Sequence, residues 1–179
     1  MRVVFQLLSV VVLFLSLTVA ATGSANAFDL SQGRMHVTAN IGSYHLNASR
    51  EFDEVNPGLG LGMSFALNDR GTEFDAEIGY YRNSLGGGSY YVMGAFDTTV
   101  AEISPRTSIR MGVFGGLAHY PGDASKFKNR GVPTFGNWVM AAGAQATLRI
   151  DDRYDLRMRV MPAGKVADAL FTLQVAAYF

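Results

Sequence analysis

The residues that could do chemistry are few and scattered. The sequence has three histidines and no cysteine, so it offers no thiol nucleophile, no disulfide and no Cys-based metal site. His36, His45 and His119 lie on separate segments without the spacing of metal ligands. Gly86-Gly87-Gly88 lacks the strand and helix that flank a phosphate-binding loop. We therefore expect neither a metal nor a cofactor.

Several charged residues recur instead at every second position. Glu73, Asp75 and Glu77 follow this spacing, and so do Arg157 and Arg159. A spacing of two places side chains on one face of a strand. Charges buried inside a protein must pair. We therefore expect these residues to form ion pairs rather than an acid/base dyad.

Alternation at period two continues through most of the sequence, which predicts strands rather than helices. The segments are Met35–Tyr44, Gly58–Leu67, Thr72–Arg82, Ser89–Thr99, Thr107–Ala118, Asn137–Ile150, Tyr154–Met161 and Ala169–Phe179. Each is close to the length that a tilted strand needs to cross a bilayer. The pattern predicts an all-β, eight-stranded antiparallel transmembrane barrel of up-and-down topology.

The connections alternate between short and long. Residues 68–71 and 151–153 form tight turns, and the stretch around Pro105 is modest, whereas residues 46–57 and 119–136 are long, polar and rich in Gly and Pro. Outer-membrane barrels have short periplasmic turns and longer external loops. We therefore expect both termini to be periplasmic, with residues 83–88 as an unusually short external loop.

The apolar residues of each strand lie on one face. On the second strand they include Leu59, Leu61 and Met63, and the last strand ends on the aromatic Phe179. A soluble lipocalin-like barrel would turn such faces inward. We favour the membrane barrel, because the opposite faces carry a sorted pattern of charged and apolar residues.

The first residues resemble an export signal. Arg2 precedes an apolar run and then Ala25-Asn26-Ala27, which fits a secretory signal peptide over residues 1–27 with the barrel over residues 28–179. An uncleaved anchoring helix is the alternative.

Formal charge is balanced, with 15 basic and 15 acidic residues and no charge run, so nucleic acid is not an expected partner. The predicted location is the outer membrane.

Strand direction places the charged inward residues in the periplasmic half and small or apolar ones in the outer half. Side chains normally just fill an eight-stranded barrel, and inward glycines would remove that filling. The alternative is that these glycines only ease strand curvature and that aromatics fill the space. We predict a site for a hydrocarbon chain lined by Gly58, Gly60, Gly62, Tyr81, Tyr91, Met93, Phe114 and Leu170.

Four features of the sequence resemble the lipid A palmitoyltransferase family of outer-membrane barrels. They are Phe52-Asp53-Glu54, the glycine-rich segment 57–62, Asn83-Ser84 at the outer end of the third strand, and His45 before the first long loop. The similarity extends over nearly the whole predicted barrel, at low identity.

The resemblance implies acyl transfer from phospholipid to lipid A, with His45 as base, Ser84 as the hydroxyl that it activates and Asn83 beside them. A hydroxyl is a poor nucleophile until a base takes its proton. Asn83 stands where the family has Asp, so the carboxylate that would orient a charged imidazole is missing there. The alternative is that His45 and Ser84 are ordinary polar loop residues.

The sequence is compatible with two functions. The first is an outer-membrane enzyme of the lipid A acyltransferase type, or a lipid-binding relative, whose partners are phospholipid and lipid A. The second is a non-catalytic structural or adhesion barrel. A pore is disfavoured because eight strands leave no aqueous channel. In either case we expect a monomer that is placed in the membrane by the barrel insertion machinery.

Overall fold

The alternating segments form long strands in the computed structural model, which describes residues 32–49, 51–129, 131–165 and 167–179. The predicted signal peptide lies outside these residues. The elements are β1 (Arg34–Leu46), β2 (Val55–Ala66), β3 (Thr72–Arg82), β4 (Gly88–Ser104), β5 (Thr107–His119), α2 (Ala124–Lys128), β6 (Thr134–Phe135), β7 (Trp138–Ile150), β8 (Tyr154–Pro162) and β9 (Ala169–Tyr178).

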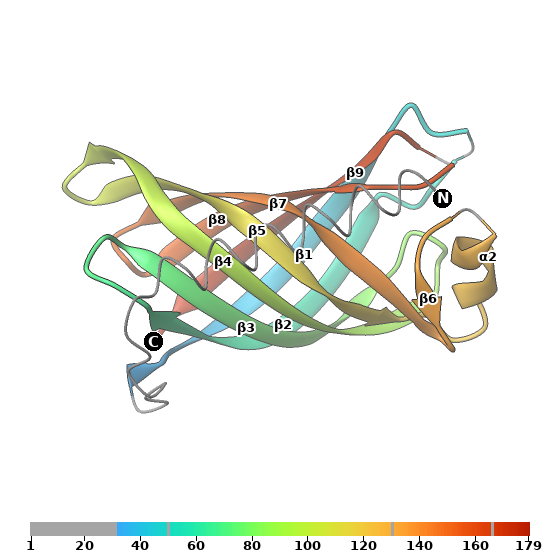
Figure 1. The fold of residues 1–179 in the computed structure, drawn as a ribbon, viewed down its shortest axis with the longest axis horizontal. Helices are drawn as coiled ribbons and strands as arrows, with labels where there is room; N and C mark the ends of the chain where they lie inside the picture. Colours follow the sequence, from blue (N-terminus) through green and yellow to red (C-terminus); the bar gives the residue numbers. More distant parts are fainter. Residues whose placement is uncertain (1–31, 50, 130, 166) are drawn as a thin grey trace. The chain divides into compact units, whose positions relative to one another are not determined.

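The eight long strands close into a barrel (Figure 1). Neighbours in sequence pair antiparallel, β5 pairs with β7, and β1 pairs with both β2 and β9. β6 is a short addition that pairs with β7. Closure leaves no sheet edge along the wall, as a strand protein in a bilayer requires. The predicted eight-stranded antiparallel barrel is confirmed.

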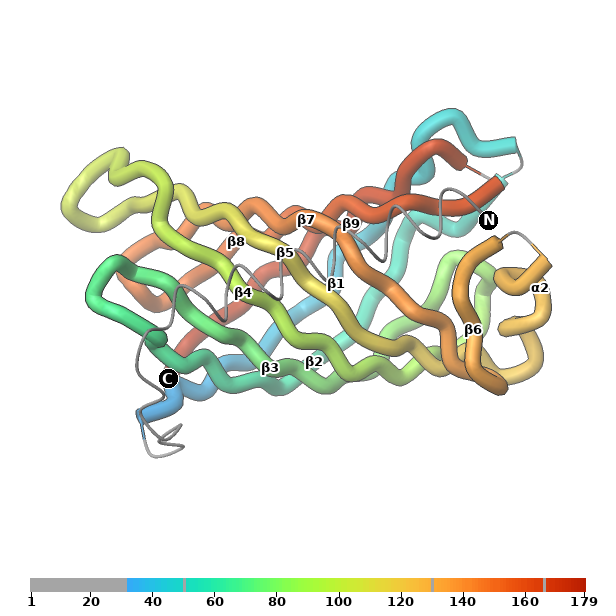
Figure 2. The backbone as a smooth tube through the Cα atoms, viewed as in Figure 1, coloured from blue at the N-terminus to red at the C-terminus, as the bar shows by residue number. Residues whose placement is uncertain are grey.

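The β2–β3, β4–β5 and β7–β8 turns lie at one end of the barrel, which we call the turn end; the opposite end is the loop end. β4 continues past the predicted end at Thr99 to Ser104, so the β4–β5 hairpin projects beyond its neighbours at the turn end (Figure 2). Its register with β5 shifts between Thr99 and Ala101 and again between Glu102 and Ser104. These irregularities interrupt the alternation, which is why the sequence pattern ended early.

A bulge in β1 changes which residues face the lumen. The register of β1 shifts between Asn40 and Gly42 against both neighbouring strands. Before the shift, the buried side chains are His36 and Thr38; after it, His45 is buried, at an odd-numbered position. The bulge therefore turns the end of β1 so that its odd-numbered residues face inward.

The predicted long loop 119–136 has structure of its own. It contains α2 and β6, and the side chains of Lys126 and Asp123 form an ion pair. Phe127 of α2 packs on Tyr120, with ring centroids 4.5 Å apart. This segment is thus folded against the loop end of the barrel.

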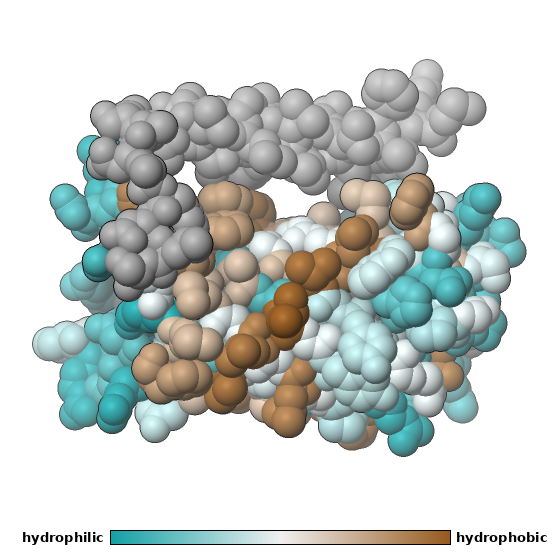
Figure 3. Space-filling view, turned by 90° about the horizontal axis from the view of Figure 1, so that it is seen from below, coloured by the Kyte–Doolittle hydropathy of each residue, from teal (hydrophilic) through white to brown (hydrophobic). Residues whose placement is uncertain are grey.

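The outer wall of the barrel is apolar. Its exposed large side chains include Leu59, Leu61, Ile78, Val92 and Met111. In Figure 3, apolar residues form an oblique band across the middle of the visible face, and polar residues gather at its two ends. This distribution matches an apolar band facing lipid between two polar surfaces. In the described part of the chain, no helix has the length and apolar character that a membrane crossing needs.

Ion pairs fill the turn half of the lumen. Glu73 binds Arg149 at 2.8 Å, Asp75 binds Arg157 at 3.2 Å, and Asp97 binds Arg110 at 2.6 Å. The predicted pairing of the acids of β3 with inward arginines is confirmed. Asp97 and Tyr178, which the sequence pattern did not point to, also belong to this network.

Candidate functional site

The loop half of the lumen encloses a cavity of about 150 Å³ with a mainly apolar wall. Side chains from the barrel strands and from the segment between β5 and β6 form this wall. Five of the residues predicted to line a chain-binding site do so: Tyr81, Tyr91, Met93, Phe114 and Leu170.

The three glycines of β2 do not line the cavity. A methyl group at Gly58 would meet the backbone and Cβ of Tyr81, and one at Gly60 would meet the hydroxyl of Tyr91. At Gly62 it would meet the His36 ring. The expectation that these glycines leave empty space is therefore wrong: larger side chains from neighbouring strands occupy that space.

His45 and Ser84 both lie in the cavity wall. His45 is the last but one residue of β1, is 8% exposed and stacks on Phe52, with ring centroids 3.9 Å apart. Ser84 is the second residue after β3, and its carbonyl oxygen accepts the Asp53 amide at 3.2 Å. The segment 52–54 thus contacts both residues.

Two further polar residues adjoin Ser84. The Ser43 hydroxyl oxygen lies 3.5 Å from that of Ser84, and Ser43 donates a hydrogen bond to the Asn56 side chain. Asn56 is buried and donates to the Asp53 carbonyl at 3.1 Å. Sequence reasoning missed Ser43, because only the β1 bulge brings it to the inner face.

Asn83 is buried, and its side chain is engaged outside the cavity. Its oxygen accepts the amides of Leu85 at 2.9 Å and Gly87 at 3.2 Å, and its nitrogen donates to the Ser89 hydroxyl at 2.9 Å. The structure therefore brings His45 and Ser84 to one cavity, while Asn83 shapes the turn that carries Ser84.

A carboxylate does lie beside His45. The Glu54 carboxylate accepts the His45 backbone amide at 3.3 Å. The neighbouring Asp53 is paired with Arg82 at 3.2 Å. Glu54 is thus a candidate for stabilising a charged imidazole.

The segment between β5 and β6 covers part of the mouth of the cavity. Phe127 and Val132 line it, and the Tyr120 hydroxyl is hydrogen bonded to that of Tyr81 at 2.7 Å. Burial raises the pKa of the Tyr120 phenol, and the bond to Tyr81 only partly offsets this effect. Tyr120 therefore stays neutral at ordinary pH and adds no charge to the mouth.

Below the apolar wall, the floor of the cavity is polar. Asn40, Tyr91, Arg159 and Gln174 line it. Tyr91 donates a hydrogen bond to Glu77, which connects the floor to the ion-pair network of the turn half.

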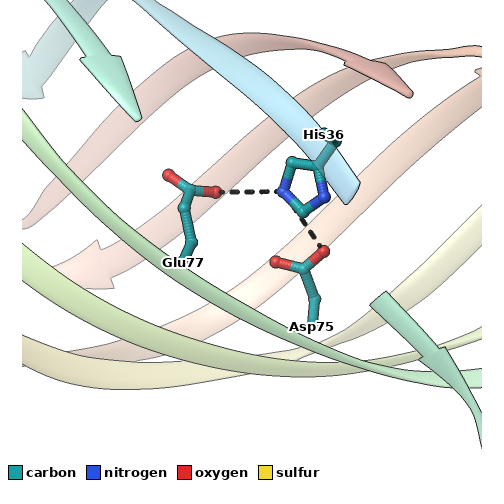
Figure 4. Close-up of side chains that lie close together, drawn as sticks. All are labelled: His36, Asp75 and Glu77. Atoms are coloured by element: carbon teal, nitrogen blue, oxygen red, sulfur yellow. Dashed lines mark ion pairs between the residues drawn. The ribbon is translucent and has the colours of Figure 1, made fainter. Parts of the chain in front are cut away.

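His36, Asp75 and Glu77 come together within that network (Figure 4). The imidazole Nε2 lies 3.5 Å from Asp75 and 3.9 Å from Glu77, so the three side chains offer ligand types that a metal could use. Both carboxylates, however, are paired with Arg157, at 3.2 and 3.3 Å. We therefore interpret the cluster as part of the ion-pair network.

Comparison with known proteins supports the fold. No protein-family model matches the sequence, and no curated protein matches it. The crystal structure of neisserial surface protein A is similar, with a TM-score of 0.51 and 15% identity over 82% of this chain and 96% of the other. A de novo designed transmembrane β-barrel gives 0.49 and 15%, over 82% of this chain and 95% of the design. The outer membrane enzyme PagL gives 0.44 and 14%, over 80% of this chain and 98% of the enzyme.

The fold is that of an outer-membrane β-barrel. The likeness to neisserial surface protein A agrees with strand count, closure and the apolar outer wall. A closed barrel with such a wall belongs in a bilayer, and the location is the outer membrane.

Proposed function

We propose that this barrel is an acyltransferase of the outer leaflet, which takes an acyl chain from a phospholipid and transfers it to lipid A. The observation that supports it is a shared cavity. His45 and Ser84, matched by resemblance to the lipid A palmitoyltransferase family, lie in the same wall as five residues predicted independently to contact a hydrocarbon chain.

In this proposal the apolar wall binds the donor chain. Met93, Phe114 and Leu170 offer the chain a surface removed from water, which favours binding by about 25 cal/mol per Å² of apolar surface buried. The donor ester then lies near the mouth, where His45 and Ser84 are.

The chemistry is a transfer through the Ser84 hydroxyl. His45 takes the hydroxyl proton as the Ser84 oxygen attacks the ester carbon, and the same proton leaves with the lysophospholipid oxygen. A lipid A hydroxyl then gives its proton to His45 and attacks the acyl-serine ester; the bond between the acyl carbon and the Ser84 oxygen breaks, and His45 returns the proton to that oxygen. Glu54, whose carboxylate binds the His45 amide, stabilises the charged imidazole in place of the carboxylate that Asn83 lacks.

The alternative is a non-catalytic structural or adhesion barrel. Such a barrel has no need of space in its lumen, and side chains would fill it to the loop end. The cavity of about 150 Å³ is the observation that favours the transferase.

Mass spectrometry of lipid A from cells with and without the protein tests the proposal. We expect an added acyl chain only when the protein is present, and its loss in Ser84→Ala and His45→Ala. The matched controls are Ser125→Ala on exposed α2 and His119→Ala, whose ring packs on Trp138. Lipid A that is the same in all strains, or transfer that survives in Ser84→Ala, would favour the non-catalytic barrel.

A further inference from the structure

Arg159 differs from the other buried arginines of the lumen. Its side chain is 4% exposed, and its Nε donates to the Gln145 oxygen at 2.8 Å. The nearest carboxylate oxygen, from Glu77, is 3.8 Å from Nη2, which is too long for a hydrogen bond. Among the described residues, neither Nη group has a hydrogen-bond acceptor. Both belong to a side chain that lines the cavity.

Glu77 is already engaged by other donors. One of its oxygens accepts from Tyr91 and from Thr38, and the other lies 3.3 Å from Arg157. Arg157, in contrast with Arg159, contacts three carboxylates at 3.2 to 3.3 Å. The carboxylates of the network therefore neutralise Arg157 by direct contact. The Nη groups of Arg159 remain available to a ligand in the cavity.

Gln174 presents an unmatched acceptor on the same floor. It is 4% exposed, and its Oε1 has no hydrogen-bond partner within the described residues. Its nitrogen donates to Asn40 at 2.5 Å, which fixes the orientation of the amide. Arg159 pairs with Thr172 and Gln174 with Arg157, so Arg159 and Gln174 are diagonal neighbours on the inner face, within reach of long side chains.

We propose that Arg159 and Gln174 bind the carboxyl group of a free fatty acid, whose chain rises through the apolar cavity toward Phe127. A carboxyl group offers two oxygens that match the planar guanidinium. When it holds its proton, its O–H can donate to Gln174. Met93 then contacts the chain, and the Phe114 ring, whose centroid lies 5.2 Å from the guanidinium carbon of Arg159, lies next to the head group.

The polarity of the cavity sets this orientation. A fatty acid whose methyl end lay at the floor would leave a buried guanidinium and a buried amide oxygen without partners, which is costly, whereas a donor chain whose ester lies at the mouth need only reach the apolar wall above the floor. A carboxyl group at the floor accepts from Arg159 and, when it holds its proton, also donates to Gln174. This site uses neither His45 nor Ser84, so it does not depend on the transfer reaction.

Titration of the refolded barrel in non-ionic detergent tests the site. The probe is palmitate labelled at its carboxyl carbon, followed by NMR, with methyl palmitate and acetate as comparison ligands. We expect palmitate to bind at least about tenfold more tightly than the methyl ester. The free energy of one hydrogen bond to a charged group corresponds to a factor of about ten in the dissociation constant. Arg159→Met should remove that advantage without weakening the ester, and Arg106→Met, on an exposed turn, should change neither.

Orientation is tested on the unaltered protein, so the result stands even if Arg159→Met fails to fold. Palmitate with a nitroxide at its chain end should broaden the resonances of Phe127 and Tyr120, and not those of Gln174. Broadening at Gln174 would overturn the proposal. Equal affinity for palmitate and its ester would do so too, and so would acetate binding as tight as that of palmitate.

Discussion

The Asn83 side chain forms three hydrogen bonds, two within the turn that carries Ser84 and one to Ser89 of β4. Its oxygen stabilises two backbone amides, and its nitrogen binds the buried Ser89 hydroxyl. The side chain is 1% exposed, so water does not replace these bonds when they are lost. At this position an amide fits better than a carboxylate. The amide nitrogen donates to the Ser89 hydroxyl oxygen, whereas a carboxylate has no donor and would need the hydroxyl to rotate and donate instead.

Replacing Asn83 should therefore cost stability. Asn83→Ala leaves the buried Ser89 hydroxyl and two half-buried backbone amides without their partner, and we expect it to lower the free energy of unfolding by about 1–3 kcal/mol. Asn83→Asp keeps both acceptor bonds and should cost less. Urea unfolding in lipid vesicles measures both. The matched control is Asn68→Ala, because Asn68 makes similar bonds to Arg70 and Thr72 in an exposed turn. Equal losses at the two sites would show that burial of Asn83 does not matter.

At the level of the strands, the glycines of β2 allow large side chains to cross the lumen. Tyr91 of β4 lies directly over Gly60 and Gly79, and its hydroxyl reaches Glu77. A β-carbon at either glycine would collide with the tyrosine ring or hydroxyl. Glycine is required here for the close approach of a neighbouring side chain.

Gly60→Ala should therefore lower the stability of the barrel itself, and not only weaken the binding of a ligand. The added methyl group displaces Tyr91 or Thr38, and overpacking of this kind costs about 1–3 kcal/mol. The control is Gly115→Ala on the outer face of β5, where the nearest atoms would lie 3.9 Å from the new carbon. Thermal unfolding of the two variants measures the difference. A stable Gly60→Ala barrel would mean that Tyr91 has room to move.

The alternation of residues predicts most strands because lipid and lumen select different side chains on the two faces. It fails where the backbone departs from a regular ladder. The β1 bulge reverses the inward positions near His45, and the end of β4 shifts register twice. α2 was not predicted, because a five-residue helix has too few turns to show a helical period. The sequence therefore indicated the cavity but not Ser43, which the bulge brings to the inner face, nor the floor residues Asn40 and Gln174.

At the scale of the whole barrel, ion pairs join opposite walls. Glu73 of β3 binds Arg149 of β7, and Asp75 of β3 binds Arg157 of β8. These strands are not neighbours in the sheet, so the pairs cross the lumen. The sequence predicted which residues face inward, since that depends on period two. It could not predict every pairing, which depends on closure of the barrel.

Arg157→Met tests the contribution of these cross-lumen pairs. The substitution leaves three buried carboxylates without their shared partner, and we expect a loss of about 3–5 kcal/mol in the free energy of unfolding. Arg106→Met removes an exposed pair with Asp151 and should cost at most about 1 kcal/mol. Urea unfolding in lipid vesicles compares the two. Similar values would indicate that water enters the turn half of the lumen.

The orientation of the barrel in the membrane is the last prediction. Long connections lie at the loop end and short turns at the turn end, so we expect the loop end to face outward. Because the sequence has no cysteine, single-cysteine variants give an unambiguous label. Ser125→Cys on α2 should react in intact cells with a maleimide too large to cross the outer membrane. Asp69→Cys in the β2–β3 turn should react only after the membrane is opened. The reverse pattern would invert the barrel, and would move the mouth of the cavity, with His45 and Ser84, to the periplasmic side, away from the outer leaflet that holds lipid A.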